Sequence, residues 1–435
     1  MAKFTRSAAV TNFAGGLSRA EVVAWRNAVC VIFALCGLGV ASWLSRVPAV
    51  RDSLQASTSQ MGLLILGIAA GSIAGLLASS HIVARFGATA TIAWCLSIGP
   101  IGFVLAGLGV TLGPSFTVVF IGLAIFGAAI GICDVAMNVS GAANERVLRR
   151  NIMPIFHAFF SFGTIIGAAL GALAERLQIP IAVHTAVIGI VIAGVALDAV
   201  RYLKSEHTVE DQAAVVPDDD HSTTWRGRLS IWRDSRTLLI GLIILGMAFA
   251  EGSANDWLAL AMVDGHRVSN ANGALVFGVF VAAMTVGRLG GVMALDRFGR
   301  VPVLRASAAL ATAGLLVVIF VPIAWVAVVG VVLWGLGSSL GFPVGMSAAA
   351  DDPKTAAARV SAVATIGYFA FLVGPPLIGF LGQNFGLLHS LLVVLVLVAV
   401  AGLVSGAARE PARAGGATAG DPRAEQHPQR ESFEP

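Results

Sequence analysis

The feature that most constrains the fold is a short loop sequence that occurs twice, each time between long apolar segments. The first copy reads Ala84-Arg85-Phe86-Gly87 and the second reads Asp296-Arg297-Phe298-Gly299-Arg300. Roughly six apolar segments surround each copy, and each could supply the ~20 helical residues that cross ~30 Å of hydrocarbon. This duplication predicts an all-α membrane protein with twelve transmembrane helices in two six-helix bundles, which are parallel repeats.

The composition is that of a chain embedded in lipid. Of the 435 residues, 57% are hydrophobic and only 12% are charged, whereas a soluble domain carries roughly 25% charged residues. The charges lie in short segments between the apolar runs and form no single basic face, so nucleic acid is not an expected partner. The 4 cysteines fall inside apolar spans without metal-like spacing. The sequence also offers no Ser/His/Asp set, no ligand cluster with metal-like spacing and no phosphate-binding loop. We therefore expect no metal site, no cofactor and no enzymatic activity.

The apolar segments predict the organisation of the whole chain. The predicted parts are a cytoplasmic N-tail (1–25), an N-terminal six-helix bundle (26–200), a cytoplasmic linker (201–236), a C-terminal six-helix bundle (237–406) and a disordered cytoplasmic tail (407–435). The predicted spans are 26–46, 60–80, 88–110, 116–139, 153–174, 180–200, 237–258, 272–294, 302–322, 325–346, 358–382 and 385–406. Most of the 28 Lys and Arg residues lie on the side of the N-terminus. The positive-inside rule then places both termini in the cytoplasm of a cell inner (plasma) membrane.

Several further motifs accompany the second loop. They are Trp43-Leu44-Ser45-Arg46-Val47-Pro48, Asp134-Val135-Ala136-Met137-Asn138, Phe156-His157-Ala158-Phe159-Phe160-Ser161, Glu251 with Asp256-Trp257, and Gly374-Pro375-Pro376. Together they resemble the major facilitator superfamily, and within it the MosC-like branch of bacterial inner-membrane carriers, over about residues 25–406. The first loop departs from the family signature, because Ala84 stands where an aspartate is usual. The resemblance implies alternating access, in which two bundles rock about a substrate site between them.

Three predicted spans each carry an ionisable side chain with a polar neighbour four residues later. The pairs are Asp134 with Asn138, His157 with Ser161, and Glu251 with Asn255. Inserting an ionised side chain at the centre of a span costs ~2.5–3.5 kcal/mol, so a residue of this kind indicates a specific role. Residues four apart on a helix are neighbours and can share a hydrogen bond. These residues are the candidates for binding the solute and the coupling proton, with Glu251 as the leading proton carrier. Structural roles are the alternative for all three ionisable residues, and for Glu251 this would be a carboxylate hydrogen-bonded to neighbouring helices.

Two further groups of residues are candidates for gates at the two ends of the molecule. The outer-gate candidates are Trp43, Arg46, Asp256 and Trp257, and the inner-gate candidates are Arg85, Gly87, Arg288, Asp296, Arg297, Gly299 and Arg300. At the outer end we expect Arg46 to pair with Asp256 when the carrier faces inward; the alternative is anchoring at the membrane boundary. At the inner end the charges are expected to form one network that Arg288 joins, with Gly299 supplying the tight turn.

The expected function is secondary active transport of a small solute by a monomeric carrier, with a proton as the coupling partner. The resemblance alone suggests a sugar-like or polyol-like solute. Two alternatives stay open: export of amphipathic or toxic compounds, and a non-transporting membrane sensor on a carrier scaffold.

Overall fold

The computed structural model describes residues 17–150, 152–204, 231–352 and 355–410, and within these parts the chain is helical, without strands. Eleven helical segments of the described chain are long and apolar enough to cross a membrane, and two of them, Ala324–Ala349 and Leu387–Ala408, each combine consecutive helices. The longest segment, Thr58–Thr111, contains a non-helical residue at Gly87 (φ 78°, ψ 160°) and therefore supplies two of the predicted spans. The predicted all-α membrane architecture of twelve spans is confirmed.

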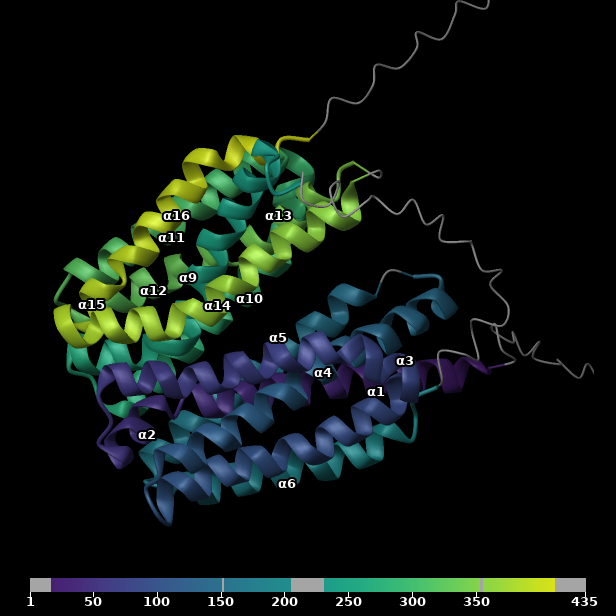
Figure 1. Ribbon diagram of the computed structural model, residues 1–435, viewed down its shortest axis with the longest axis horizontal. Helices are drawn as coiled ribbons and strands as arrows, with labels where there is room; N and C mark the ends of the chain where they lie inside the picture. The colour runs from purple at the N-terminus through teal and green to yellow at the C-terminus, as the bar shows by residue number, and fades with distance from the viewer. Residues whose placement is uncertain (1–16, 151, 205–230, 353–354, 411–435) are drawn as a thin grey trace, which may run out of the picture.

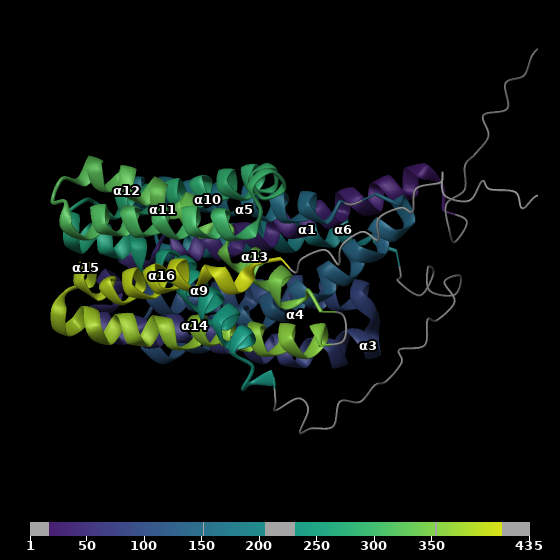
Figure 2. The same ribbon diagram turned by 90° about the horizontal axis from the view of Figure 1, so that it is seen from above.

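Each half of the chain forms one group of helices. The first consists of α1 (Arg19–Leu44), α2 (Val47–Leu54), α3 (Thr58–Thr111), α4 (Phe116–Leu148), α5 (Met153–Arg176) and α6 (Ile181–Val200). The second consists of α9 (Ser235–His266), α10 (Asn270–Phe298), α11 (Arg300–Phe320), α12 (Ala324–Ser338), α13 (Gly341–Ala349), α14 (Ala356–Phe385), α15 (Leu387–Ser390) and α16 (Leu392–Val404). Seen from above, the helices of both halves run along one common direction (Figure 2).

Local sequence signals explain where several helices begin. Ser18 and Glu21 form a capping box at the start of α1, and Ser57 and Gln60 form another at the start of α3. In each box the side chains satisfy amide groups that the first helical turn leaves without a partner. Two predicted spans are interrupted: 325–346 is divided into α12 and α13, and 385–406 into α15 and α16. The short helix α2 was not predicted, because eight residues give too little apolar periodicity to stand out.

Glycines allow the helices within the first half to pack at backbone distance. A methyl group at Gly127 or Gly131 of α4 would collide with backbone carbonyl oxygens of α3. A methyl group at Gly163 of α5 would collide with the carbonyl oxygen of Ala34 in α1. In lipid, where apolar burial favours association little, such close approach supplies the van der Waals contact that holds helices together.

The two halves meet at one end of the molecule and diverge toward the other (Figure 1). We call the first the α2 end, since it carries α2 and α15, and the second the loop end, since it carries residues 84–87 and 296–300. Across the halves, α14 packs against α3 and α10 packs against α5. Gly62 of α3, for example, faces the backbone of Pro375 and Pro376 in α14. The described chain both begins and ends at the loop end (Figure 1).

The described residues do not test all of the predicted domain limits. The predicted N-tail, linker and C-tail lie largely within residues 1–16, 205–230 and 411–435, which are outside the described parts of the chain.

Candidate functional site: a cavity between the two halves

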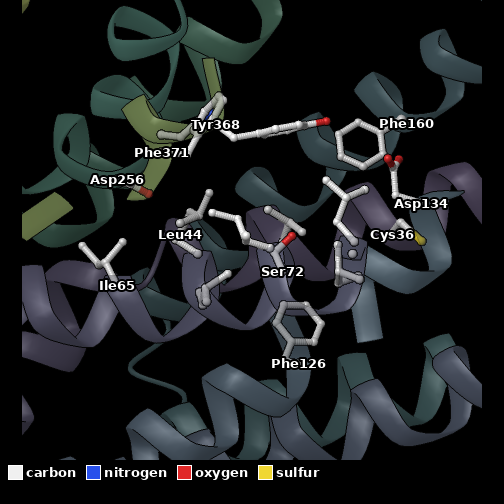
Figure 3. A pocket seen from close by; sticks show the side chains of 18 of the residues that line it. Cys36, Leu44, Ile65, Ser72, Phe126, Asp134, Phe160, Asp256, Tyr368 and Phe371 are labelled. Carbon is white, nitrogen blue, oxygen red and sulfur yellow. The ribbon is translucent and has the colours of Figure 1, made fainter. Parts of the chain in front are cut away.

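A cavity of about 310 Å³ lies between the two groups of helices. Residues of α1, α3, α4 and α5 line it from the first half, and residues of α9 and α14 line it from the second (Figure 3). Its lining is Cys36, Val40, Leu44, Ile65, Ile68, Ala69, Ser72, Ile73, Leu76, Phe126, Ile130, Gly131, Asp134, Met137, Phe160, Asn255, Asp256, Tyr368 and Phe371. Most of these side chains are aliphatic or aromatic. Among these described residues two are carboxylic acids, and none is lysine, arginine or histidine.

Asp134 projects into this cavity from α4 (Figure 3). The side-chain amide of Asn138 donates to the carbonyl oxygen of Asp134 at 2.8 Å and to its carboxylate at 3.4 Å. The predicted contact between these two residues is therefore confirmed. Tyr368 of the second half extends from α14 toward Asp134 and Phe160 (Figure 3). This carboxylate thus faces aromatic rings from both halves, and no cation is paired with it among the described residues.

Asp256 lines the same cavity from α9, next to Asn255. The expected pairing of Arg46 with Asp256 is wrong for this structure. Arg46 instead contacts Glu175 of α5 at 3.1 Å and donates to the carbonyl oxygen of Ile179 at 2.9 Å. The reason is geometric: Arg46 lies at the end of its span, whereas Asp256 lies roughly 15 Å before the end of α9 at 1.5 Å per residue. Asp256 is thereby left facing the cavity.

The two tryptophans proposed beside that gate are packing residues. Trp43 is 1% exposed and Trp257 is 0% exposed. Trp43 contacts the ring of Phe103 edge-on, with 6.3 Å between ring centroids. Trp257 lies against Gly379 of α14. Anchoring at the membrane boundary would require an accessible ring, so that interpretation of these tryptophans is also wrong.

The α2 end is instead closed by polar contacts that sequence reasoning missed. Arg51 of α2 forms an ion pair with Asp264 of α9, with its Nη1 atom 2.6 Å from the carboxylate. Beside it, the Asn270 side chain donates to Asp52 at 2.8 Å. We call these two interactions the α2 contact. Adjacent charges that follow a span directly, such as Arg51 and Asp52, were the available signal, but their partners lie more than 200 positions away.

Glu251 is paired, in contrast to the two cavity carboxylates. Its carboxylate lies 2.8 Å from Nη2 of Arg288. The Nε atom of the same arginine donates to the carbonyl oxygen of Ser339 at 3.4 Å. The prediction that Arg288 joins the charges of the second loop is therefore wrong. Arg288 precedes the loop by two to three turns, so its side chain reaches the neighbouring helix α9 instead.

His157 and its neighbour do not form the predicted side-chain pair. The Ser161 hydroxyl donates to the backbone carbonyl of His157 at 3.2 Å, which leaves the imidazole out of the contact. The ring of His157 is exposed and contacts Phe33 edge-on at 5.2 Å between centroids. His157 is not among the residues that line the cavity.

At the loop end both glycines adopt backbone conformations that L-residues rarely take. Gly87 has φ 78° and Gly299 has φ 77°. Since nothing lies within 4 Å of a methyl group built on Gly299, the turn requires this glycine for its φ and not for space. Arg85 and Arg297 each lie over the phenylalanine that follows them, 5.4 Å from the ring centroid.

The charge network of the second loop differs from the predicted one. Arg300 pairs with Asp351 at 2.6 Å, and Asp351 also pairs with Arg236 at 2.8 Å. Asp296 has no ion-pair partner within the parts of the chain that the structure describes. The network therefore centres on Asp351, a residue just after α13 that sequence reasoning did not single out.

Comparison with known proteins agrees with this architecture. A model of the Major Facilitator Superfamily matches residues 28–370 and 257–431. An uncharacterised MFS-type transporter of Yersinia pestis is 31% identical over 352 residues, which cover 81% of this chain and 87% of the relative. The membrane protein MosC of Rhizobium meliloti is 27% identical over 373 residues, which cover 85% and 86%. The resemblance inferred from the sequence motifs is thus confirmed.

Solved structures share the fold at low sequence identity. A mutant of the nucleoside transporter NupG superposes with a TM-score of 0.71 at 15% identity, covering 89% of this chain and 100% of that one. A bacterial homologue of the human lysosomal transporter Spinster, in an inward-facing and unoccupied conformation, also gives 0.71, at 14% identity, covering 90% and 98%. The protein is a multi-pass membrane carrier and not an enzyme. Its sequence, its helices and its relatives agree that the chain belongs to the major facilitator superfamily.

Proposed function

We propose that this protein is a proton-coupled secondary carrier that moves a small solute across the inner (plasma) membrane by alternating access, as a monomer. The observation that carries the proposal is the cavity between the two halves, whose two carboxylates lack a cation partner among the described residues. A cavity shared by two similar helix bundles is where such carriers bind their solute.

In this proposal, the structure represents the inward-facing state of the carrier, which is open toward the cytoplasm and closed toward the outside. The loop end is the cytoplasmic end, because it carries the arginines of both loops, as the positive-inside rule requires. The α2 contact then closes the outer end. The described ion pairs of the loop end stay within one half, as those of Asp351 with Arg236 and Arg300 do. The likeness to a structure solved in an inward-facing conformation supports this reading.

Asp256 replaces Glu251 as the leading proton carrier in this proposal. The charge of Glu251 is balanced by Arg288 in an ion pair, so protonation would leave a guanidinium without its partner. Asp256 holds its charge in a mostly apolar cavity without such a partner. Binding a proton there removes the cost of holding an isolated charge away from water, and this difference lets a proton bias one end state.

The experiment needs no knowledge of the solute. Spin labels are placed at Ala84 on α3 and Ser361 on α14, both exposed at the loop end. The distance between them is measured in nanodiscs between pH 5 and pH 8. We expect two distance populations whose ratio changes with pH, and we expect Asp256→Asn to hold one ratio at every pH.

Glu251→Gln and Ser72→Ala provide the comparison. Neither should remove the pH response, although Glu251→Gln is expected to change the ratio because it leaves Arg288 without its partner. A pH response that survives in Asp256→Asn and disappears in Glu251→Gln would return the role to Glu251. A single distance under all conditions would contradict alternating access.

The lining of the cavity also favours one of the candidate solute classes. The sugar-like or polyol-like solute rests on the family resemblance, and a polyhydroxylated solute needs several donors and acceptors around it. The lining is dominated by aliphatic and aromatic side chains. This observation favours a solute with an apolar body, as the alternative of amphipathic compounds requires.

A further inference from the structure

We propose that the cavity selects an organic cation, an amine or quaternary ammonium ion with compact apolar substituents, which binds between Asp134 of the first half and Tyr368 of the second. This inference rests on the proposed transport function and names the class of its solute. The charges, the aromatic rings and the size of the cavity support it.

The charge of the cavity is unbalanced. Asp134 and Asp256 both line it, and among the described lining residues none is basic. The arginines near this region already have partners: Arg288 is paired with Glu251, and Arg46 is paired with Glu175. An anionic solute would meet two carboxylates without a counter-charge. A cationic solute would supply the counter-charge that the protein itself lacks at Asp134.

Aromatic rings surround the carboxylate of Asp134. Phe160 of α5 lies beside it, and Tyr368 extends toward it from α14 (Figure 3). Phe371 lies one turn further along α14 and also lines the cavity. The face of an aromatic ring attracts a cation, and such rings together with a carboxylate are a common way of binding ammonium groups. A neutral polyol carries no charge for these ring faces to attract.

The remaining lining limits the body of the solute. Away from Asp134 the walls consist largely of aliphatic side chains of α1 and α3, with Ser72 and Asn255 as neutral polar groups. Hydroxyl groups placed against such walls would lose their hydrogen bonds to water without replacement. A volume of about 310 Å³ suits a compact apolar group. The cavity therefore fits a charged head with an apolar body.

A cation at this position would contact both halves of the carrier. Asp134 belongs to α4 and Tyr368 belongs to α14. The two helices lie in different bundles, so a solute between these side chains gains interactions when the bundles approach each other around it. Differential binding of this kind is what allows a ligand to shift a conformational equilibrium.

The test uses the full-length protein purified in detergent, with benzyltrimethylammonium as the cationic probe. Benzenesulfonate and myo-inositol are the anionic and neutral probes. Binding is measured by isothermal titration and by the shift of the unfolding temperature, which a ligand specific for the folded state must raise. We expect benzyltrimethylammonium to bind, and the other two probes to bind at least tenfold more weakly.

Variants locate the binding site. Asp134→Asn should weaken binding of the cation at least tenfold. Tyr368→Phe keeps the aromatic ring and should bind the cation within about threefold of the parent. Tyr368→Ala removes the ring and should bind the cation more than threefold more weakly than the parent. Asp198→Asn removes an acid that is 67% exposed on α6 and is not among the residues that line the cavity, so it should leave binding unchanged. Circular dichroism establishes whether each variant is folded. If Asp134→Asn does not fold, Asp134→Glu, which keeps the negative charge, takes its place and should still bind the cation.

The outcomes separate this inference from the proposed function. Binding of the cation that is unaffected by Asp134→Asn, or binding of myo-inositol in preference to the cation, would overturn the inference. If in that case the loop-end distance still changes with pH in the parent but not in Asp256→Asn, the proposed transport function stands and only the solute class is wrong. If the cation binds as expected but the distance never changes, the cation site stands and alternating access is contradicted.

Discussion

The α2 contact gives the sharpest prediction, because its members come from different halves and, in the proposed transport cycle, meet only when the α2 end is closed. Arg51 of α2 lies 2.6 Å from Asp264 of α9, and Asn270 donates to Asp52 beside them. Replacing Arg51 or Asp264 by alanine removes an interaction that exists in one end state. Each substitution should therefore shift the carrier toward the state that is open at the α2 end.

The exposure of the two side chains sets the magnitude. Arg51 is 18% exposed and Asp264 is 34% exposed, so the pair is neither fully solvated nor fully buried. Burial alone disfavours the charged guanidinium, but the hydrogen bond and the charge of Asp264 outweigh it and raise the pKa of Arg51 above its ordinary value. A pair of this kind is worth about 1 kcal/mol, which corresponds to a roughly fivefold change in the ratio of the two states. Since Arg51 stays protonated, it adds no pH dependence of its own.

The assay is a double-mutant cycle on the conformational equilibrium. Spin labels at Ser53 and Ile323, both exposed at the α2 end, report the open and closed populations. Parent, Arg51→Ala, Asp264→Ala and the double variant are compared at low and high ionic strength. The cycle isolates the pair from the weaker contact of Arg51 with Asp52, which the single substitution also removes.

The reasoning is refuted by additive effects. If the double variant changes the free-energy difference between the two states by the sum of the two single changes, the pair contributes nothing to closure. Arg176→Ala is the matched control, since Arg176 lies at the same end and has no ion-pair partner among the described residues; it should leave the ratio unchanged. High salt should reduce the coupling but not abolish it, because the pair is partly shielded from solvent.

Three further predictions concern the loop end. Gly299→Ala should destabilise the fold by about 1–3 kcal/mol, measured by denaturant unfolding in detergent, because its φ of 77° is unfavourable for L-residues; an equal loss for an alanine at Gly290, where nothing restricts a methyl group, would argue against this cause. Asp351→Asn should cost about 2 kcal/mol in the same assay, since it leaves two arginines without their shared carboxylate. Asp234→Ala should cost about 1 kcal/mol, because Asp234 caps α9. The hydrogen bond from Thr237 lowers the pKa of Asp234. The stability that the ionised carboxylate contributes is therefore complete above the pKa of Asp234 in the unfolded chain and is lost as pH falls through the lower pKa of the folded state. Asp234→Asn should retain much of the cap but none of this pH dependence.

Local features of the chain could be inferred from the sequence. The spans follow from runs of apolar residues, whose length alone determines whether a helix can cross a bilayer. The turn at Gly299 follows from the conformational freedom of glycine. The contact of Asn138 with Asp134 follows from their spacing on one helix. Each of these depends on residues a few positions apart, so the covalent chain is sufficient to determine them.

The pairing of charges was decided by the tertiary structure alone. Glu251 is paired with Arg288, 37 positions away, and Arg51 is paired with Asp264, 213 positions away. A membrane helix is apolar toward lipid and also toward its neighbours, so the hydrophobic pattern does not indicate which face looks inward. The rotation of each helix is fixed by close packing between glycines and backbones, which brings distant segments together. The sequence therefore determined that this chain spans the membrane as two similar halves, and only their packing decided which acids are neutralised and which face the cavity.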